Sequence, residues 1–378
     1  MPGEPVIEAV SAVPFVDLGR SHAPLREAIL ADIAALIDAG SFTNGWQVAA
    51  FEEEFAGFCD ADFCVGFASG LDALRLALIA SALERGDEVI VPANTFVATL
   101  EAVTQAGGSP VLVDVNEDDC NLDAAQAEAA VTERTRFILP VHLYGQMADM
   151  GALGDLAARR GLAVLEDACQ AHGASRDGLR AGSGGSAAFS FYPAKNLGAF
   201  GDAGALVTPD EALAERLRAL REHGQTAKYH HELEGWTARL DTIQAIALLH
   251  KLPQLDRWND ERRAAAAWYR ERLADVGDLR MLAVPAGSEP VYHVFVVRTA
   301  DPVALGEFLG ERGIGTGRHY PEPAHLSPAY DWLGHRRGAF PVTEALADEV
   351  LSLPLFPGIS EGQLETVSAA VEDFFRRS

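Results

Sequence analysis

The stretch FSFYPAKNLGAFGDAGAL, residues 189–206, places a lysine just after an apolar segment that has the composition of a buried strand. A lysine in such a place is costly unless it is paired or used chemically. In a partly apolar pocket a lysine loses its proton easily and becomes a nucleophile toward aldehydes. The alternative is an exposed loop lysine, which this segment would predict if it stood alone. The role of Lys195 therefore depends on what the rest of the chain brings to the same place.

Upstream of this stretch, short apolar segments alternate with helical patterns. A helix is predicted over 71–83, and the buried-strand candidates are 64–69, 88–93, 110–115, 137–145 and 162–168. Apolar strands that alternate with helices predict a mainly parallel sheet with both faces covered. The stretches 187–192 and 204–208 follow the last clear crossover and are joined by a loop, so they can pair differently.

The pattern changes after about residue 250, where Pro253 interrupts an apolar segment. The predicted elements that follow are a helix over 260–275, a strand over 292–298 and a helix over 303–312. An irregular stretch then leads to a last helix. This helix is predicted to begin at Ser360, because Gln363 has the spacing of a capping box.

This change of pattern divides the chain into two predicted domains. Residues 1–255 form a large α/β domain that includes an N-terminal helix at 21–39, and residues 256–378 form a smaller α+β domain. A chain of 378 residues is expected to hold about two to three domains, which agrees with the division.

The composition argues against several classes of protein. The formal net charge is −25, whereas nucleic-acid and anionic-membrane surfaces need clustered cations. No window holds about 18 uninterrupted apolar residues, and the N-terminal residues lack the basic-then-apolar order of a signal peptide. The four cysteines form no CxxC pair, and His230, His231 and Glu232 lack HExxH spacing. We expect a cytoplasmic protein with no metal site and no nucleic-acid or membrane partner.

The polar residues of interest follow the predicted strands. They lie in ASG (68–70), PANTF (92–96), EDACQ (166–170) and YPAK (192–195), each at a strand's carboxyl end. In open α/β sheets, ligands bind beyond the carboxyl ends of the strands. The sequence therefore predicts one ligand site at this edge of the sheet.

Each group at this edge has a functional and a structural interpretation. Ser69 and Gly70 open a helix, where free N–H groups bind phosphate, although a plain N-cap is an equal alternative. Asp167 could pair with a protonated pyridine nitrogen, form an internal salt bridge or cap a helix. Ser190 could reach a phosphate from the strand that leads to Lys195. Neither GxGxxG nor GxxxxGK[ST] is present, and together these groups are the parts needed to hold pyridoxal 5′-phosphate (PLP).

In these motifs the chain resembles the DegT/DnrJ/StrS family of PLP-dependent sugar aminotransferases. The resemblance covers almost the whole chain and implies the fold-type I (aspartate aminotransferase-like) architecture, with a mainly parallel sheet in the large domain. Its most specific pieces are FTNGWQVAAFEEEFA (42–56), SGLDAL (69–74), GDEVIVPANTFVAT (86–99), PVHLYGQ (140–146), EDACQAHGA (166–174), FSFYPAKNLGAFGDAGA (189–205) and RLDTIQA (239–245).

The resemblance implies a role for each site residue. Lys195 would be the catalytic residue that binds PLP covalently, and the cofactor would cycle with pyridoxamine 5′-phosphate. Asp167 would pair with the pyridine nitrogen, Gln170 would contact the ring hydroxyl, and Phe96 would stack on the ring. The phosphate would be held by Ser190, Gly70 and Leu71.

The resemblance also implies a homodimer with shared active sites. Family members complete the phosphate site with a loop of the neighbouring subunit, in which a Gly-aromatic-Asn sequence precedes the RLD motif. Here that sequence is Gly235, Trp236 and Thr237, so a threonine hydroxyl stands where the amide is usual. Arg239 is a second candidate for a contact across the subunits.

The form of the lysine motif resembles enzymes that aminate C-3 of a keto sugar. The implied reaction moves an amino group from L-glutamate to a nucleotide-linked keto-deoxysugar, with a dTDP-3-keto-6-deoxyhexose as the expected acceptor. Tyr192, His319 and Tyr320 are candidate substrate contacts, with loop packing as the alternative. Other open interpretations are action at C-4 or on a UDP-3-keto sugar, a PLP-dependent sugar dehydratase, in which histidine replaces the lysine, and a non-catalytic PLP-binding regulator.

Overall fold

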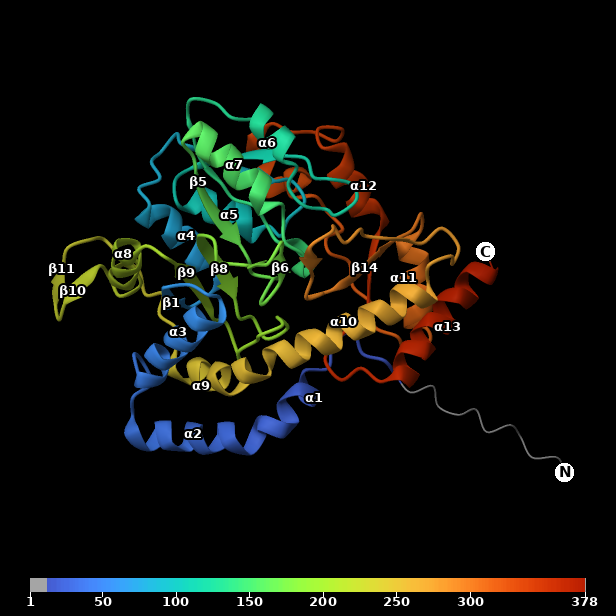
Figure 1. The fold of residues 1–378 in the computed structure, drawn as a ribbon, viewed down its shortest axis with the longest axis horizontal. Coiled ribbons are helices and arrows are strands. Elements are labelled where there is room, and N and C mark those ends of the chain that lie inside the picture. Colours follow the sequence, from blue (N-terminus) through green and yellow to red (C-terminus); the bar gives the residue numbers. More distant parts are fainter. Residues whose placement is uncertain (1–11, 378) are drawn as a thin grey trace.

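The computed structural model describes residues 12–377 and contains a seven-stranded central sheet (Figure 1). Residues 1–11, where the expectation about a signal peptide falls, and Ser378 lie outside the described residues. The strand order is β1-β9-β8-β5-β4-β2-β3. The bounds are β1 Phe63–Phe67, β2 Glu88–Pro92, β3 Ser109–Val113, β4 Thr135–Ile138, β5 Ala163–Asp167, β8 Ser186–Ser190 and β9 Gly204–Thr208.

The sheet is parallel except at one strand. β9 pairs antiparallel with both β8 and β1, whereas the pairs from β8 to β3 are parallel. The predictions of a mainly parallel sheet and of different pairing for the last two strands are therefore confirmed. The α/β fold class is confirmed with them.

Helices cover both faces of this sheet, because successive strand residues point to opposite sides. One face packs on α4 (Gly70–Ala80), α5 (Ala98–Gln105) and α8 (Glu211–Arg221). The other face packs on α3 (Trp46–Phe58) and α9 (Thr242–Lys251) near β8, and on α6 (Ala124–Ala129) and α7 (Met150–Arg160) near β4. Phe189 and Phe191 pack edge-on against Phe55 there, at centroid distances of 5.1 Å.

The C-terminal part is built on a three-stranded antiparallel sheet of β12, β14 and β15. The long helix α10 leads from the large sheet to this part (Figure 1). The bounds are α10 Leu255–Arg272, β12 Arg280–Met281, β14 Phe295–Arg298, α11 Pro302–Gly310, α12 Pro341–Glu349, β15 Val350–Leu353 and α13 Glu361–Arg377. Val13 also bridges to Ile314, so the first described residues lie against this sheet.

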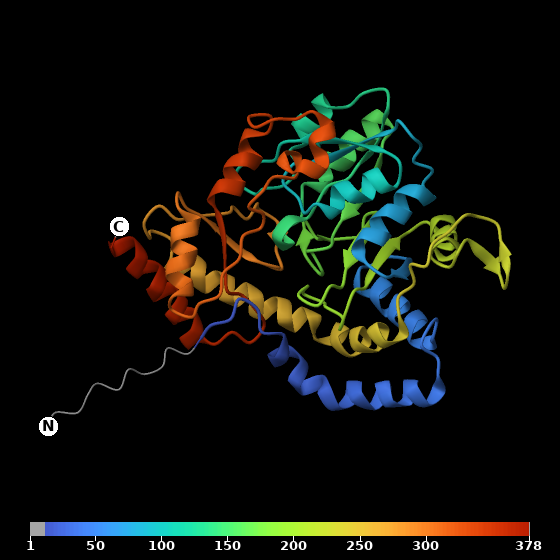
Figure 2. The ribbon, with the colours of Figure 1, turned by 180° about the vertical axis from the view of Figure 1, so that it is seen from behind.

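The remaining elements are short or peripheral. The N-terminal helices run along the outside of α9, and a hairpin of β10 and β11 projects from the body (Figures 1 and 2). Their bounds are α1 Leu18–His22, η1 Ala23–Leu25, α2 Arg26–Ala39, η2 Leu143–Gly145, β6 Ser175–Arg176, β7 Leu179–Arg180, β10 Gln225–Ala227, β11 His230–His231, η3 Leu252–Gln254, β13 Ser288–Glu289, η4 Ala324–Leu326 and η5 Pro328–Leu333.

Several predicted boundaries were wrong: the helix over 71–83 ends at Ala80, and the strand over 292–298 begins at Phe295. The strand expected over 137–145 ends at Ile138, because the chain turns into η2, where Tyr144 has a φ of 60°. The helix expected from residue 260 begins at Leu255, because Pro253 is accommodated in the preceding turn η3. The capping box at the start of α13 is confirmed: Gln363 N donates to Ser360 Oγ (3.2 Å), and Ser360 N donates to Gln363 Oε1 (3.0 Å).

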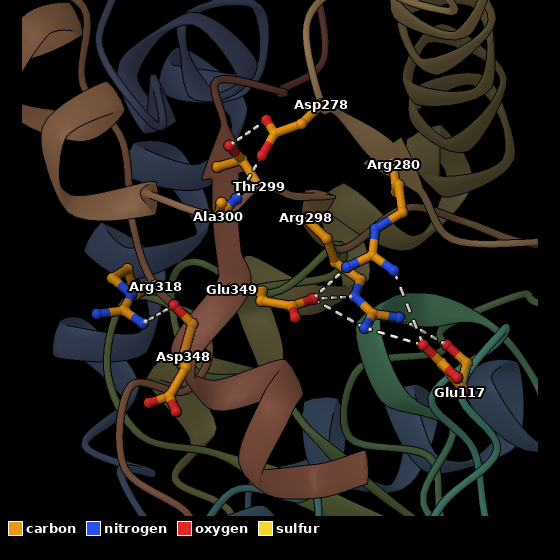
Figure 3. Close-up of polar contacts among 9 residues, drawn as sticks. All are labelled: Glu117, Asp278, Arg280, Arg298, Thr299, Ala300, Arg318, Asp348 and Glu349. Atoms are coloured by element: carbon orange, nitrogen blue, oxygen red, sulfur yellow. Dashed lines mark hydrogen bonds and ion pairs between the residues drawn. The ribbon is translucent and has the colours of Figure 1, made fainter.

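A polar cluster joins the C-terminal sheet to the loop after β3 (Figure 3). Arg298 is 5% exposed and donates to Glu349 Oε2 (2.9 Å) and to Glu117 Oε1 (3.2 Å). Arg280 reaches the same Glu349 oxygen at 2.6 Å.

Nearby, Asp114 at the end of β3 accepts bonds from the amide and hydroxyl of Thr343 at the start of α12 (2.9 and 2.7 Å). These contacts fix α12 beside the large sheet (Figure 2).

Candidate active site

The strand ends that carry the polar motifs meet at one place. A Cβ on Gly70, after β1, would lie 2.8 Å from Ser190 Cβ at the end of β8 and 2.7 Å from Cys169 Sγ after β5. The Thr99 hydroxyl, which follows the β2 loop, donates to Asp167 Oδ2 at the end of β5 (2.8 Å). The sequence prediction of one site at this edge of the sheet therefore agrees with the structure.

Helix α4 begins inside this site. Its N-cap Ser69 accepts a hydrogen bond from Asp72 N (3.0 Å), so the N-cap interpretation of that serine holds. An α-helix leaves its first amides without intrahelical partners, so the amides of Gly70 and Leu71 are available to a ligand. Gly204 allows this turn to pack closely, since a Cβ there would lie 2.3 Å from the Ser69 carbonyl carbon. Ser190 Oγ lies beside the same turn and accepts a bond from Tyr192 N (3.3 Å).

The two carboxylates of EDACQ have different surroundings. Glu166 Oε2 lies 2.9 Å from His142 Nε2 and accepts a bond from Gly182 N (3.1 Å). His142 Nδ1 accepts from Ala148 N, so Nε2 carries the proton and donates to Glu166. This pair is enclosed in the core, as the interpretation of His142 as a hydrogen-bonded core residue predicts.

Asp167, by contrast, has only neutral donors. It is 6% exposed and accepts bonds from the Thr99 hydroxyl (2.8 Å) and from Cys169 N (3.2 Å). Thr95 completes the chain, because its hydroxyl lies 2.7 Å from that of Thr99 and must donate to it. No cation in residues 12–377 forms an ion pair with Asp167. A buried carboxylate without a cation favours binding of a cationic ligand group.

Lys195 lies in the loop that follows β8 and is partly buried. Its amide donates to Tyr192 O (2.8 Å), and a Cβ on Gly198 would lie 2.3 Å from Pro193 O, so the loop folds tightly back on itself. Burial lowers the pKa of the Lys195 amine, and the nearby Cys169 and Asp167 oppose this shift without cancelling it. The neutral amine, which is the nucleophilic and basic form, is thereby more accessible than in an exposed lysine.

Side chains of the large sheet's loops meet residues 319 and 320 of the C-terminal part over the site. Gln170 Oε1 accepts from Tyr144 N (2.7 Å), and Gln170 Nε2 donates to the Tyr320 hydroxyl (3.0 Å). The rings of Phe96 and Tyr320 have centroids 5.4 Å apart. The Tyr144 hydroxyl donates to the carbonyl of His319. Phe96, Gln170 and Tyr320 are thus brought together as the motifs suggested.

The other two candidate substrate contacts border this group. His319 stacks on Phe15 (5.8 Å between centroids), and its Nδ1 lies 2.8 Å from Ser352 Oγ. Burial and the charge of Lys195 lower the pKa of His319 to about 4, so its ring is neutral at pH 7. The Tyr192 side chain is 55% exposed.

The comparisons with known proteins agree with this geometry. The model of the DegT/DnrJ/EryC1/StrS aminotransferase family matches residues 24–372. The chain belongs to this family. The aminotransferase family assignment confirms the resemblance drawn from the motifs.

Two curated relatives of this aminotransferase illustrate the family. A dTDP-3-amino-3,4,6-trideoxy-alpha-D-glucose transaminase of Streptomyces venezuelae is 48% identical over 366 residues, which cover 97% of each chain. A UDP-N-acetyl-3-dehydro-alpha-D-glucosamine 3-aminotransferase of Acidithiobacillus ferrooxidans is 44% identical over 363 residues, which cover 96% of this chain and 97% of the relative. Both names place the amino group at position 3.

A solved structure has nearly the same fold. S. venezuelae DesV, in complex with a ketimine intermediate, superposes with a TM-score of 0.95 at 47% identity and covers 97% of this chain and 99% of its own. The fold-type I aminotransferase architecture expected from the motifs is therefore confirmed.

Two predicted cofactor residues of this aminotransferase lie apart from the group just described. Thr237 Oγ1 lies 3.2 Å from His223 Nε2, and Arg239 donates to Glu222 Oε1 (2.8 Å). Arg239 also pairs with Phe67 at the end of β1, and among the described residues neither side chain forms a hydrogen bond with Gly70 or Ser190. They follow the projecting β10–β11 hairpin, at the rim of the sheet (Figure 1).

Sequence reasoning missed several residues that shape the site. Thr99 stood inside a quoted motif, and a hydroxyl in the first turn of the helix that follows a strand end was the signal that could have found it. Tyr144 gave no comparable signal, because its role depends on a loop far away in the sequence. The same holds for Asn259 of α10, whose Oδ1 accepts a bond from Asn196, the residue after Lys195 (2.9 Å).

Within residues 12–377 there is no group of three or more His, Cys, Asp or Glu side chains that could hold a metal ion. Among the same residues, no helix is both long and apolar enough to cross a membrane.

Proposed function

We propose that this chain is a PLP-dependent aminotransferase that moves an amino group from L-glutamate to a nucleotide-linked keto-deoxysugar. The observation that supports this most directly is the meeting of a buried carboxylate, a helix N-terminus and a partly buried lysine at one sheet edge. Each of the three fits one part of the cofactor: the pyridine nitrogen, the phosphate and the aldehyde.

The site residues fit PLP in detail. Asp167, held by Thr99, would carry the charge that keeps the pyridine nitrogen protonated. The amides of Gly70 and Leu71 and the Ser190 hydroxyl would bind the phosphate, and Phe96 would cover the ring. Gln170 would contact the ring hydroxyl with the amide hydrogen that it does not donate to Tyr320. When bound, PLP supplies an electron sink for the carbon that loses or gains the proton.

Lys195 would move that proton. Its lowered pKa favours a neutral amine. This amine would accept a proton from the α-carbon of the donor and deliver it to the cofactor carbon next to the transferred nitrogen. Tyr320, held by Gln170, and the neutral His319 would orient the sugar. Tyr192 would contact the sugar from the loop that follows β8.

We infer that the amino group goes to C-3, with a dTDP-3-keto-6-deoxyhexose as the expected acceptor. The position named in both relatives supports C-3. The acceptor nucleotide differs between them, so UDP-3-keto sugars are the first alternative to assay. Lys195 stands where the dehydratases of the family have histidine, which argues against dehydration.

The working unit would be a homodimer. The exposed β10–β11 hairpin, with Tyr229 82% exposed at its tip, supports this proposal, since it offers a surface for a second subunit. Thr237 and Arg239 would then reach the partner's phosphate site. We further propose a cytoplasmic location and the division at residue 255, where α10 begins.

The test is an assay with L-glutamate and a panel of dTDP- and UDP-linked 3-keto and 4-keto sugars. We expect 2-oxoglutarate and an amino sugar in equal amounts, with the new amine at C-3 by NMR. Deoxysugar formation without amine transfer, or amination at C-4, would contradict this assignment. A Lys195→Ala control should bind PLP and form no product.

A further inference from the structure

Two buried cations lie near the catalytic lysine without an acidic partner. Lys251 is 2% exposed and Arg262 is 3% exposed. Among residues 12–377 neither forms an ion pair with an Asp or Glu side chain. Burying a cation costs free energy of desolvation unless an anion or a strongly polar group interacts with it.

The contacts that these two side chains do make are with neutral groups. Lys251 Nζ donates to the carbonyl of Gly198 and lies 4.7 Å from the centroid of the Phe200 ring. Arg262 Nη1 donates to three carbonyls, and its Nε is buried without a partner in the described structure. Burial lowers the pKa of Lys251 to about 8 and that of Arg262 to about 10, so both are largely charged at pH 7.

Both cations line one small cavity, and so does Lys195. The cavity has a volume of about 20 Å³ and lies between residues 16–22, the loop residues 193–198 and α10. Asn196 and Trp258 also line it, and the Asn196 Oδ1 is buried without a partner in the described residues.

The remaining ionisable groups around the cavity leave it positive. Asp17 is the one acidic residue in its lining, and Arg20 stands 3.6 Å from that carboxylate. Burial and the charge of Lys251 lower the pKa of His22 to about 4, so His22 is neutral at pH 7. Two of the three lysines in the chain therefore face one cavity with little acidic compensation.

We propose that this cavity is a binding site for a small monoanionic group, held by Lys251 and Arg262 beside Lys195. A volume of about 20 Å³ accommodates one group of about the size of a water molecule or a halide. The anion has two possible sources. It is either a free monovalent ion from solution or, if the proposed function holds, a carboxylate oxygen of the amino-acid donor.

The first arm of the test does not depend on catalysis. Crystals of the purified protein soaked in sodium bromide should show an anomalous bromide peak in the cavity of the wild type and none in Lys251→Met. Arg257→Met is the matched control, because it removes an exposed cation of α10, the helix that also carries Arg262, and it should keep the peak. A peak that persists in Lys251→Met would overturn the proposal.

The second arm identifies the source. If the donor's carboxylate enters the cavity, Lys251→Met should raise KM for the donor at least tenfold and leave KM for the keto sugar unchanged, with Lys251→Arg restoring part of the loss. A bromide site with an unchanged donor KM identifies a free ion as the occupant. If the wild type turns over no donor at all, the proposed function fails and the bromide arm still decides the site.

Water is the alternative occupant, and the two arms exclude or confirm it together. Water gives no anomalous peak, and removal of the Lys251 charge would then leave the donor KM unchanged. This combination would overturn the proposal. The melting temperature of Lys251→Met serves as a check on folding, because the variant removes an unpaired buried charge and also the donor of the Gly198 carbonyl.

Discussion

The carboxyl edge of the large sheet and the loops that close over it from the C-terminal part are built by different means. At the sheet edge, Gly70, Asp167 and Ser190 take their positions from strand ends and from close backbone packing. On the closing side, Tyr320 depends on Gln170, which is 150 positions away in the sequence. Changes at the sheet edge should therefore abolish the cofactor site, whereas changes on the closing side should alter substrate handling by smaller factors.

The largest effect is expected at the sheet edge, for Lys195→Ala. Loss of the amine that moves the proton should reduce turnover by at least about 1,000-fold, within the range of general acid–base catalysis. The protein should fold and bind PLP without a covalent link, which gel filtration in denaturant would show as cofactor release. Turnover within tenfold of the wild type would contradict the role of Lys195.

The next effect tests the close packing of the same edge. In Gly204→Ala the new Cβ would lie 2.3 Å from the Ser69 carbonyl carbon, so the turn that begins α4 must shift. We expect a cost of about 1–3 kcal/mol and a weaker affinity for PLP, measured by thermal melting and by cofactor titration.

The matched control for that change is Gly57→Ala in α3. A Cβ at position 57 meets nothing within 4 Å, so the substitution should stabilise the helix by about 0.5–1 kcal/mol. Equal PLP affinity in the two variants would show that the turn at Gly70 does not depend on Gly204.

On the closing side the effects should be smaller. Tyr320→Phe removes the hydrogen bond from Gln170, which is worth about 1 kcal/mol, so kcat/KM for the sugar should fall about fivefold. A double-mutant cycle with Gln170→Ala tests the pairing, because the two changes should not add. Additive losses would mean that the two side chains act separately.

The smallest effect is a change in pH dependence near the site. Burial first, and then the charge of Lys195, lower the pKa of His172 to about 3, against about 6.5 in the unfolded chain. Between these values the unfolded state binds a proton that the native state does not, so stability should fall as the pH drops through this window. His172→Asn should reduce the slope by about one proton, measured by denaturant unfolding between pH 4 and 6. An unchanged slope would contradict the lowered pKa.

The contrast also explains what the sequence could predict. The strand pattern and the strand-end motifs predicted that Asp167, Ser190 and Lys195 lie at one edge of the sheet, because parallel strands bring their carboxyl ends together. Tyr144 was hidden inside a segment that resembled a strand, and its position follows from a turn that no local pattern indicated. Lys251 and Arg262 were not recognised, because these two residues come close to Lys195 only in the folded chain.

We infer that Lys195 serves a PLP site that accepts amino groups. The most direct test is the absorption spectrum of the purified wild-type protein before and after L-glutamate is added. We expect the visible band of protein-bound PLP, and its replacement by the spectrum of the pyridoxamine form when the donor is present. A protein that stays colourless with added PLP would contradict the cofactor and with it the role of Lys195.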